Sequence, residues 1–317
     1  MVEQNSMILL TLHSAFFAIG FIGNIFILTV HFLDWLKTHD INPCDLIINS
    51  IVCSNLFLQG IVVSNQFLYE LFKKVYSQSW IIKSFIVIMS SFSFSSLWCS
   101  TCLCFYYCVK IVSFKGTLFY KLKANIATMV PWLLVVCFAL SWAVALPSYW
   151  DLYIDIPASA YNISLLLNRT SVISFNVKSR CHCLFQMYIL VTSLAFIIIS
   201  SSAVAIITSL CKHMRKMARN NDGHGSGKIN SHLSAAKTVT FLLILYLAFY
   251  GALNTIYNDP TAAGNLYFSL CFLAVSVFPT INAIILISGN RKLMNFVKEL
   301  LGIKSTDGIT EVTVTSQ

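Results

Sequence analysis

The sequence predicts an all-α membrane protein, a bundle of seven transmembrane helices that forms one domain over residues 1–317. Of the 317 residues, 57% are apolar and only 10% are charged, whereas a soluble domain carries about 25% charged residues. A membrane span needs roughly 20 apolar residues, so seven spans occupy about 140–175 positions and leave only short loops. Composition and length therefore exclude a disordered chain, a coiled coil and a cytosolic enzyme. The expected spans are residues 7–33, 45–69, 82–109, 126–149, 184–210, 236–257 and 265–288.

The distribution of basic residues predicts how the chain is oriented. One set of alternate loops, together with the C-terminal tail, holds fifteen of the 21 Lys and Arg residues, and the other set holds six. Cytoplasmic loops carry such an excess, so we expect the N-terminus outside and the C-terminus inside. A short amphipathic helix is expected on the cytoplasmic side after the last span. The net charge of +9 is then a sign of topology and does not indicate a nucleic-acid partner.

The longest predicted loop, residues 150–183, carries two N-x-[ST] sequons, which begin at Asn162 and Asn168. The charge distribution independently places this loop outside. We therefore expect an N-linked glycan on at least one of the two asparagines. At the end of the same loop, the sequence leaves the oxidation state of Cys181 and Cys183 open.

The spans contain little ionisable chemistry. Their central portions have no Asp, Glu, Lys or Arg, which mark the proton and ion paths of transporters and pumps. Neither H-E-x-x-H nor G-x-S-x-G occurs, so we expect no catalytic site and no cofactor. The cysteines of span three fall on two sides of a helix and are not expected to bind a metal. These cysteines are Cys99, Cys102, Cys104 and Cys108.

Polar, uncharged residues instead occur in the outer halves of several spans. Examples are Gln66, Ser90, Ser93, Tyr246, Tyr250 and Asn254. Two interpretations remain open for each of them. The first is a hydrogen bond that joins two helices inside the bundle. The second is a polar anchor in a mostly apolar ligand pocket.

Five motifs then occur in order along the chain. They are G-N-I-F-I at 23–27 with Asp34-Trp35 in span one, residues 97–114 of span three, S-L-C-K-H at 209–213, H-L-S-A-A-K-T at 232–238 and I-L-I-S-G-N-R-K-L at 285–293. Through these motifs the chain resembles the bitter taste receptors, the type 2 taste receptor family of G-protein-coupled receptors, over residues 23–301. The type 1 vomeronasal receptors share part of the pattern. Lys110-Ile111 and the start of span six favour the taste receptors.

Two positions depart from the family pattern. Asn55 stands where the family usually has an arginine in span two, and Asn282 stands where it has a histidine in span seven. Both are polar interior positions, so their joint change indicates a divergent member.

The resemblance implies a multi-pass receptor of the plasma membrane. It would detect small, largely apolar bitter compounds from outside, in contact with membrane lipids, and would activate a heterotrimeric, gustducin-like G protein. A pheromone receptor of the vomeronasal type is the alternative, and a channel or transporter is a further one. Homo- or heterodimerisation is left open.

The resemblance also implies two groups of functional residues. The ligand-contact positions fall on Gln66, Met89, Ser90, Ser93, Phe94, Tyr246, Phe249, Tyr250, Phe272 and Val275. The positions expected to contact the G protein are Tyr106, Lys110, His213, His232 and Lys237.

Overall fold

The computed structural model describes residues 2–76, 78–112, 116–155, 176–220, 226–258 and 266–302. Asn162 and Asn168, the predicted glycosylation sites, lie outside these residues. The elements are α1 (Val2–Thr38), α2 (Pro43–Leu71), α3 (Lys73–Tyr76), α4 (Ser79–Ile111), α5 (Thr117–Ala145), α6 (Ser148–Asp151), β1 (Leu152–Asp155), β2 (Asn176–Ser179), α8 (His182–Asn220), α9 (Ser226–Asn258), α10 (Leu266–Gly289) and α11 (Arg291–Leu300).

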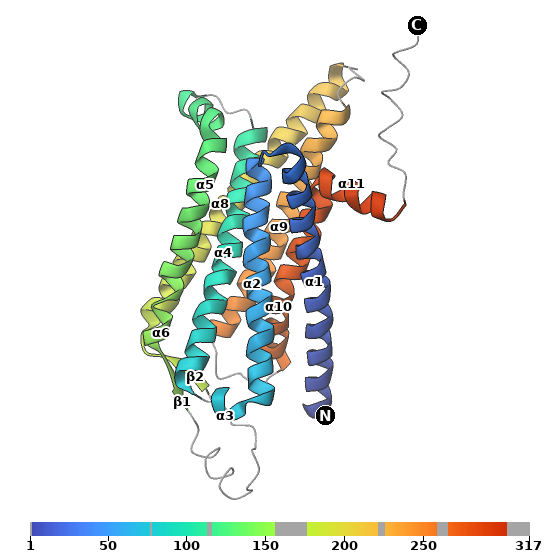
Figure 1. Ribbon diagram of the computed structural model, residues 1–317. Helices are drawn as coiled ribbons and strands as arrows, with labels where there is room; N and C mark the ends of the chain where they lie inside the picture. The colour runs from blue at the N-terminus through green and yellow to red at the C-terminus, as the bar shows by residue number, and fades with distance from the viewer. Residues whose placement is uncertain are drawn as a thin grey trace, which may run out of the picture.

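The long helices confirm a multi-pass membrane helix bundle (Figure 1). Within the described part of the chain, six helices are long and apolar enough to cross a membrane, or seven if α10 and the bent continuation α11 are counted as one span. Several helices extend past the predicted spans. For example, α1 runs over Val2–Thr38 where 7–33 was expected, because a helix continues into polar residues that hydropathy does not mark.

The two ends of the bundle differ. At one end, called here the α3 end, lie α3, α6, the two strands and the N-terminus of α1 (Figure 1). At the other, called here the α11 end, lie α11, the connection from α1 to α2, the C-terminal end of α8 and the N-terminal end of α9 (Figure 1). The predicted outside therefore corresponds to the α3 end, and the predicted inside to the α11 end.

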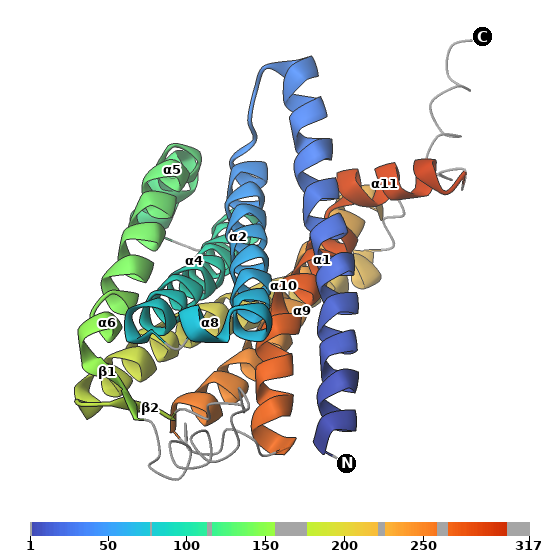
Figure 2. The ribbon, with the colours of Figure 1, turned by 60° about the horizontal axis from the view of Figure 1, so that its bottom comes forward.

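Helix α4 forms the centre of the bundle and is packed against α2, α5, α8 and α9 (Figure 2). Its span is 72% buried, more than any other candidate span among the described residues. The buried face is rich in serine, and small side chains let helices approach closely. Hydroxyls such as that of Ser91 donate to the carbonyl four residues earlier in the same helix, here Val87 at 2.8 Å. The buried hydroxyls of Ser100 and Thr101 bond in the same way, at 2.8 and 2.9 Å, whereas the buried hydroxyl of Ser95 has no partner among the described residues.

A sharp bend separates α10 from α11. The two helices meet at 92°, and Asn290 between them has extended backbone angles. Its side-chain oxygen accepts a hydrogen bond from the backbone N–H of Lys292 at 3.0 Å, which caps the first turn of α11. Immediately before the bend, Gly289 lies against Thr238 of α9, where a β-carbon would approach the hydroxyl to 1.8 Å. Only glycine allows this contact between α9 and α10.

The loop expected between spans four and five contains a small antiparallel sheet. β1 pairs with β2, with Leu152 opposite Ser179 and Asp155 opposite Asn176. Asp151 extends the pairing: its carbonyl accepts from the backbone N–H of Arg180 at 3.2 Å, and its carboxylate accepts from the N–H of Cys181 at 2.8 Å. Cys181 is disulfide-bonded, which the sequence had left open.

Candidate functional site

A cavity of about 370 Å³ lies among α1, α2, α4 and α10, in the half of the bundle nearer the α3 end. Its volume is within the range of small-molecule sites, and its walls are mostly apolar. No charged residue lines it among those that the structure describes. The lining residues are Ser14, Phe17, Leu58, Gln59, Val62, Val63, Gln66, Phe67, Leu71, Met89, Val275, Ser276 and Pro279.

Three of the predicted ligand-contact residues line this cavity. Gln66, Met89 and Val275 come from three different helices and converge on it. The α1 wall, made by Ser14 and Phe17, was not among the predictions, and neither was Gln59. Gln59 could have been noticed, because it lies two helical turns before Gln66 on α2 and so shares its face. The side chain of Phe272 is not among those that the structure describes.

The polar end of the cavity is made by Gln59. Its side chain is only 3% exposed, and its Nε2 donates to Thr280 Oγ1 at 3.5 Å. Gly20 of α1 provides the space for this amide, since a β-carbon there would lie 2.2 Å from Nε2. The other amide atom, Oε1, is buried and accepts no hydrogen bond from the described residues. Gln59 therefore lines the cavity with a side chain whose Oε1 atom is enclosed by the protein, and the other polar lining residues are Ser14, Gln66 and Ser276.

Other predicted contact residues are packed in the core. Tyr246 of α9 is 2% exposed, and its hydroxyl donates to the backbone carbonyl of Thr192 on α8. Its ring stacks between Phe196 and Tyr250, with centroid distances of 5.9 and 6.0 Å. These contacts join α8 to α9, and Tyr246 and Tyr250 do not line the cavity.

Phe94 and Phe249, like Tyr246, are packed against aromatic side chains of neighbouring helices. Phe94 of α4 packs on Tyr188 of α8 with ring centroids 5.6 Å apart, and Phe249 of α9 packs on Phe278 of α10 at 4.3 Å. Ser93 is buried, and Ser90 is half-buried. The structure thus places Gln66, Met89 and Val275 in the cavity wall, whereas the predicted aromatic residues pack α4 on α8, α8 on α9 and α9 on α10.

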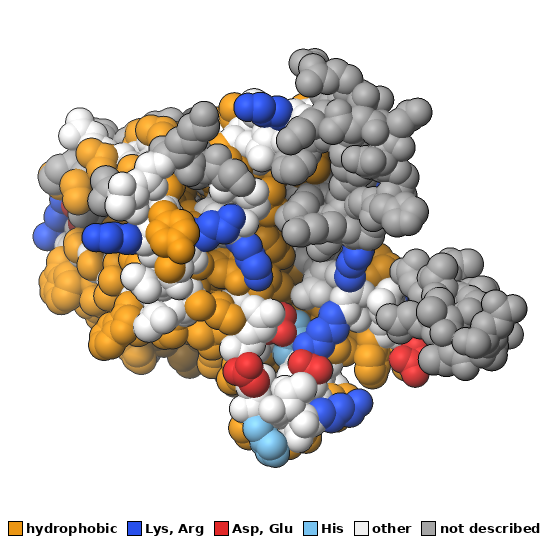
Figure 3. Space-filling model, turned by 90° about the horizontal axis from the view of Figure 1, so that it is seen from above, with side chains coloured by type: hydrophobic (Ala, Val, Ile, Leu, Met, Phe, Trp, Pro, Cys, Tyr) orange, Lys and Arg blue, Asp and Glu red, His pale blue; other side chains and the backbone are white. Residues whose placement is uncertain are grey.

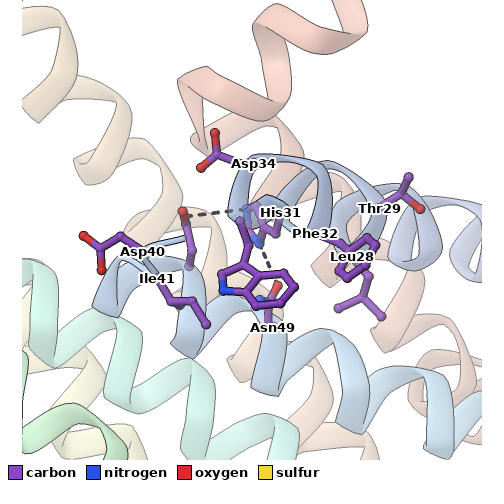
Figure 4. Close-up of a pocket in the computed structure, with 10 residues that line it drawn as sticks. Leu28, Thr29, His31, Phe32, Asp34, Asp40, Ile41 and Asn49 are labelled. Carbon is purple, nitrogen blue, oxygen red and sulfur yellow. Dashed lines mark hydrogen bonds and ion pairs between the residues drawn. The ribbon is translucent and has the colours of Figure 1, made fainter. Parts of the chain in front are cut away.

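The α11 end carries a second hollow, of about 480 Å³, where carboxylates gather among scattered basic side chains (Figure 3). Figure 4 shows His31 at its centre. The Nδ1 atom of His31 lies 2.6 Å from Asn49 Oδ1, and Nε2 lies 3.5 Å from Asp45 Oδ1 (Figure 4). The lining residues are Leu28, Thr29, His31, Phe32, Asp34, Trp35, Asp40, Ile41, Asp45 and Asn49.

The predicted G-protein contacts are at this same end. Lys110, at the end of α4, is exposed, and its Nζ donates to the hydroxyl of Tyr106 at 3.2 Å. Tyr106 is only 4% exposed and positions the ammonium, whose Nζ lies 5.3 Å from the ring centroid. Lys237 is exposed near the start of α9. His213 and His232 belong to α8 and α9, but their side chains lie outside the description.

The two departures from the family pattern meet inside the bundle. Ser96 of α4 donates to Asn55 Oδ1 at 2.6 Å and accepts from Asn282 Nδ2 at 3.5 Å. All three side chains are fully buried. One hydroxyl therefore links α2, α4 and α10 through the two asparagines that replace the expected arginine and histidine.

Comparisons with known proteins give a consistent picture. A family model described as "Taste receptor protein (TAS2R)" matches residues 1–304. The chain is 29% identical to taste receptor type 2 member 4 of Pan troglodytes and of Homo sapiens, over 90% of this chain and 94% of each relative. It is also 29% identical to taste receptor type 2 member 7 of Macaca mulatta, over 92% of both chains.

Proposed function

Because the chain belongs to the taste receptor type 2 family, we propose that it detects small, largely apolar organic compounds outside the cell and activates a heterotrimeric G protein. Its family consists of G-protein-coupled receptors, so the protein is a bitter taste receptor and not an enzyme. The observation that carries the proposal is the family match over residues 1–304, which includes both the cavity and the α11 end. The plasma membrane is the proposed location.

The proposed orientation puts the α3 end outside and the α11 end inside. The side chains of Lys37, Lys110 and Lys237, which lie near the ends of α1, α4 and α9 at the α11 end, are exposed. Their position is in keeping with the excess of basic residues in cytoplasmic loops, and Figure 3 shows Lys and Arg side chains on this face. The amphipathic helix α11 would then lie along the cytoplasmic surface of the membrane, because it leaves the bundle at 92° to α10.

The proposed ligand site is the cavity among α1, α2, α4 and α10. Its walls carry no charge among the described residues, so an ionised compound would lose its hydration without gaining a partner. A neutral compound would bury apolar surface against Val62, Met89 and Val275 and place its polar groups near the two glutamines. The predicted contacts on α9, from Tyr246 to Tyr250, would form a second layer that supports α4 and α8.

Activation would shift the balance between two arrangements of the bundle. A ligand that fills the cavity contacts α1, α2, α4 and α10 together, so it favours whichever arrangement fits it better. Lys110 and Lys237, together with His213 and His232, are the residues proposed to meet the G protein at the other end, and the buried Tyr106 would position the Lys110 ammonium.

The test is a calcium assay in cells that express the full chain with a G protein that releases calcium. A panel of neutral, apolar compounds should contain an agonist whose response disappears without the G protein. In the variant Val275→Trp, the indole would fill the cavity and abolish the response at matched surface expression. Val136→Trp is the control, since Val136 is 60% exposed on α5. A current that persists without the G protein would support a channel instead.

A further inference from the structure

We propose that the cavity opens sideways into the bilayer, between α1 and α2, so that its ligands are neutral compounds that first dissolve in the membrane. This inference rests on the proposed function, since it concerns how a ligand reaches that same cavity. It goes further by naming the entrance and the property that a compound needs in order to pass through it, which is partition into lipid.

The wall that α2 contributes to the cavity extends from the core of the bundle to its outer face. Leu58 and Gln59 belong to the buried part of this wall. Val63 and Phe67, one turn apart, line the same cavity, yet they are 39% and 58% exposed. Both lie within the apolar span Pro43–Leu68, where an exposed apolar side chain faces lipid. The cavity therefore reaches the lipid-facing side of α2.

The helices α1 and α2 meet closely at the inner end of the cavity. A β-carbon on Gly20 would lie 2.2 Å from Gln59 Nε2, so the two backbones approach each other there. From this contact toward the α3 end, Phe17 of α1 and Val63 of α2 both line the cavity. In this half of the bundle the two helices therefore have the cavity between them.

The α1 side of this opening is exposed as well. Ser14 is exposed and Phe17 is half-buried, and both line the cavity. The ring of Phe17 stacks on that of Phe21 with a centroid distance of 5.7 Å, and Phe21 is itself exposed. Helix α1 lies at the edge of the bundle (Figures 1 and 2), and its span is 28% buried, compared with 72% for α4. The rim of the opening is thus formed by Phe17 on α1 and by Val63 and Phe67 on α2.

The neighbouring gap, between α2 and α4, is closed toward the α3 end. Tyr76 of α3 and Ile82 of α4 are buried in a small apolar cluster there, and the side chains of Leu68 and Phe85 pack against it. Phe85 lies one turn before Met89, which lines the cavity. Within the described ranges, this cluster therefore separates Met89 from the water at the α3 end.

The rim of the opening favours compounds that dissolve in lipid. Phe17, Val63 and Phe67 are apolar, and none of the lining residues in the described ranges is charged. A neutral compound that passes between α1 and α2 exchanges contacts with acyl chains for contacts with side chains of similar polarity. A charged compound would first have to enter hydrocarbon, which is strongly unfavourable for an ion. The ligand class is therefore neutral compounds that accumulate in the bilayer.

The experiment measures which solvent reaches the cavity, and it needs no agonist and no G protein. The purified full-length receptor carries a nitroxide spin label on an introduced cysteine and is placed in phosphatidylcholine nanodiscs. Collisions of the label are measured with oxygen, which concentrates in hydrocarbon, and with nickel ethylenediaminediacetate, which stays in water. Wild-type receptor treated in the same way gives the background from the native cysteines.

Three label positions are compared. Met89→Cys puts the label on the cavity wall, Val136→Cys on the exposed face of α5, and Asp40→Cys in the exposed connection between α1 and α2. The label at Met89→Cys should collide with oxygen as the label at Val136→Cys does. It should be shielded from the nickel complex, unlike the label at Asp40→Cys.

A further substitution tests the entrance itself. In Val63→Trp, the indole would narrow the opening between α1 and α2, so the label at Met89→Cys should lose most of its accessibility to oxygen. Ser64→Trp is the matched control, because Ser64 is exposed at the next position of α2 and is not among the residues that line the cavity.

Two results would overturn the proposal. One is access of the nickel complex, or of neither reagent, to the label at Met89→Cys. The other is an equal effect of Val63→Trp and Ser64→Trp on the collisions of that label with oxygen. A calcium response to neutral compounds would in either case leave the receptor function itself intact.

Discussion

The ammonium of Lys292 lies 2.5 Å from a carboxylate oxygen of Asp34, a residue 258 positions earlier in the chain. It also lies 3.4 Å from Asp45 Oδ2. One side chain therefore ties α11 to both α1 and α2. Burial lowers the pKa of Lys292, but the hydrogen bond to Asp34 and the charges of both aspartates outweigh it and raise the pKa above the ordinary 10.5.

Removing this tie should loosen α11. In Lys292→Ala, we expect faster backbone hydrogen exchange in residues 291–300, while the overall melting temperature changes little because the ion pair is partly exposed. Lys298→Ala, on the same helix, is the control. Hydrogen–deuterium exchange read by mass spectrometry checks this. Unchanged exchange in Lys292→Ala would mean that packing alone holds the helix.

The same tie should be insensitive to pH over the physiological range. A lysine with a raised folded-state pKa contributes stability below its unfolded pKa and loses it only as pH rises through the folded value. That window lies above 10.5 for Lys292. The ratio of exchange rates between Lys292→Ala and wild type should therefore stay constant from about pH 6 to 9. A ratio that falls within this window would contradict the raised pKa.

Gly20 should be irreplaceable at the contact of α1 with α2 and α10. A β-carbon there would lie 2.2 Å from Gln59 Nε2 and 2.3 Å from Thr280 Oγ1. We expect Gly20→Ala to destabilise the receptor by about 1–3 kcal/mol, as overpacking does. Gly23→Ala, one turn later, meets Ala283 at an ordinary 3.5 Å and is the control. Thermal unfolding of purified protein compares them, and equal melting temperatures would show that the Gln59 amide moves aside freely.

Lys110 should matter for signalling rather than for folding. Its ammonium is exposed and is positioned by the buried Tyr106. Losing an interface contact worth about 1 kcal/mol weakens coupling about fivefold, so Lys110→Ala should lower agonist potency by about that factor. Lys121→Ala, also exposed at this end, is the control. Surface expression must be matched. If the double variant Lys110→Ala/His213→Ala keeps normal agonist potency, neither residue belongs to the proposed G-protein interface.

The orientation predicts glycosylation outside the cell. If the α3 end faces outward, Asn162 or Asn168 should carry an N-linked glycan. N-glycosidase treatment should then increase the gel mobility of the wild-type protein and leave Asn162→Gln/Asn168→Gln unchanged. The same mobility before and after treatment of wild type would remove this support for the orientation.

The helices were predictable from hydropathy, but their ends were not. Apolar runs located the spans because lipid demands about 20 apolar residues of each. The extension of α8 to Asn220, where residue 210 was expected, involves polar residues that hydropathy does not mark as helical. The pairing of β1 with β2 likewise depends on backbone hydrogen bonds within a loop that lacks an apolar pattern.

The cavity was predictable only in part, because a sequence does not say which helices are neighbours. Gln66, Met89 and Val275 were predicted and line it, whereas Ser14 and Phe17 were missed because the packing of α1 against α10 is a tertiary contact. Tyr246, in contrast, was predicted as a ligand contact and does not line this cavity. An aromatic residue in a pocket wall and one in the core look alike in sequence, and only the bond to the Thr192 carbonyl distinguishes them.

The hydroxyl of Ser96 should stabilise the receptor through Asn55 and Asn282, which stand where the family resemblance implies an arginine and a histidine. Ser96→Ala leaves Asn55 Oδ1 and Asn282 Nδ2 without this partner in a fully buried place, which costs about 1–3 kcal/mol. Ser91→Ala is the control, because the buried Ser91 hydroxyl donates to the carbonyl of Val87 in its own helix. The melting temperature should fall further in Ser96→Ala than in Ser91→Ala.

A double variant tests whether the residues act together. Adding Asn282→Ala to Ser96→Ala should lower the free energy of unfolding by less than Asn282→Ala does in the wild type, since the two side chains share one network. The alternative is that packing alone holds α2, α4 and α10 together. In that case the two serine variants would lower the melting temperature equally, and the losses of stability in the double variant would be strictly additive.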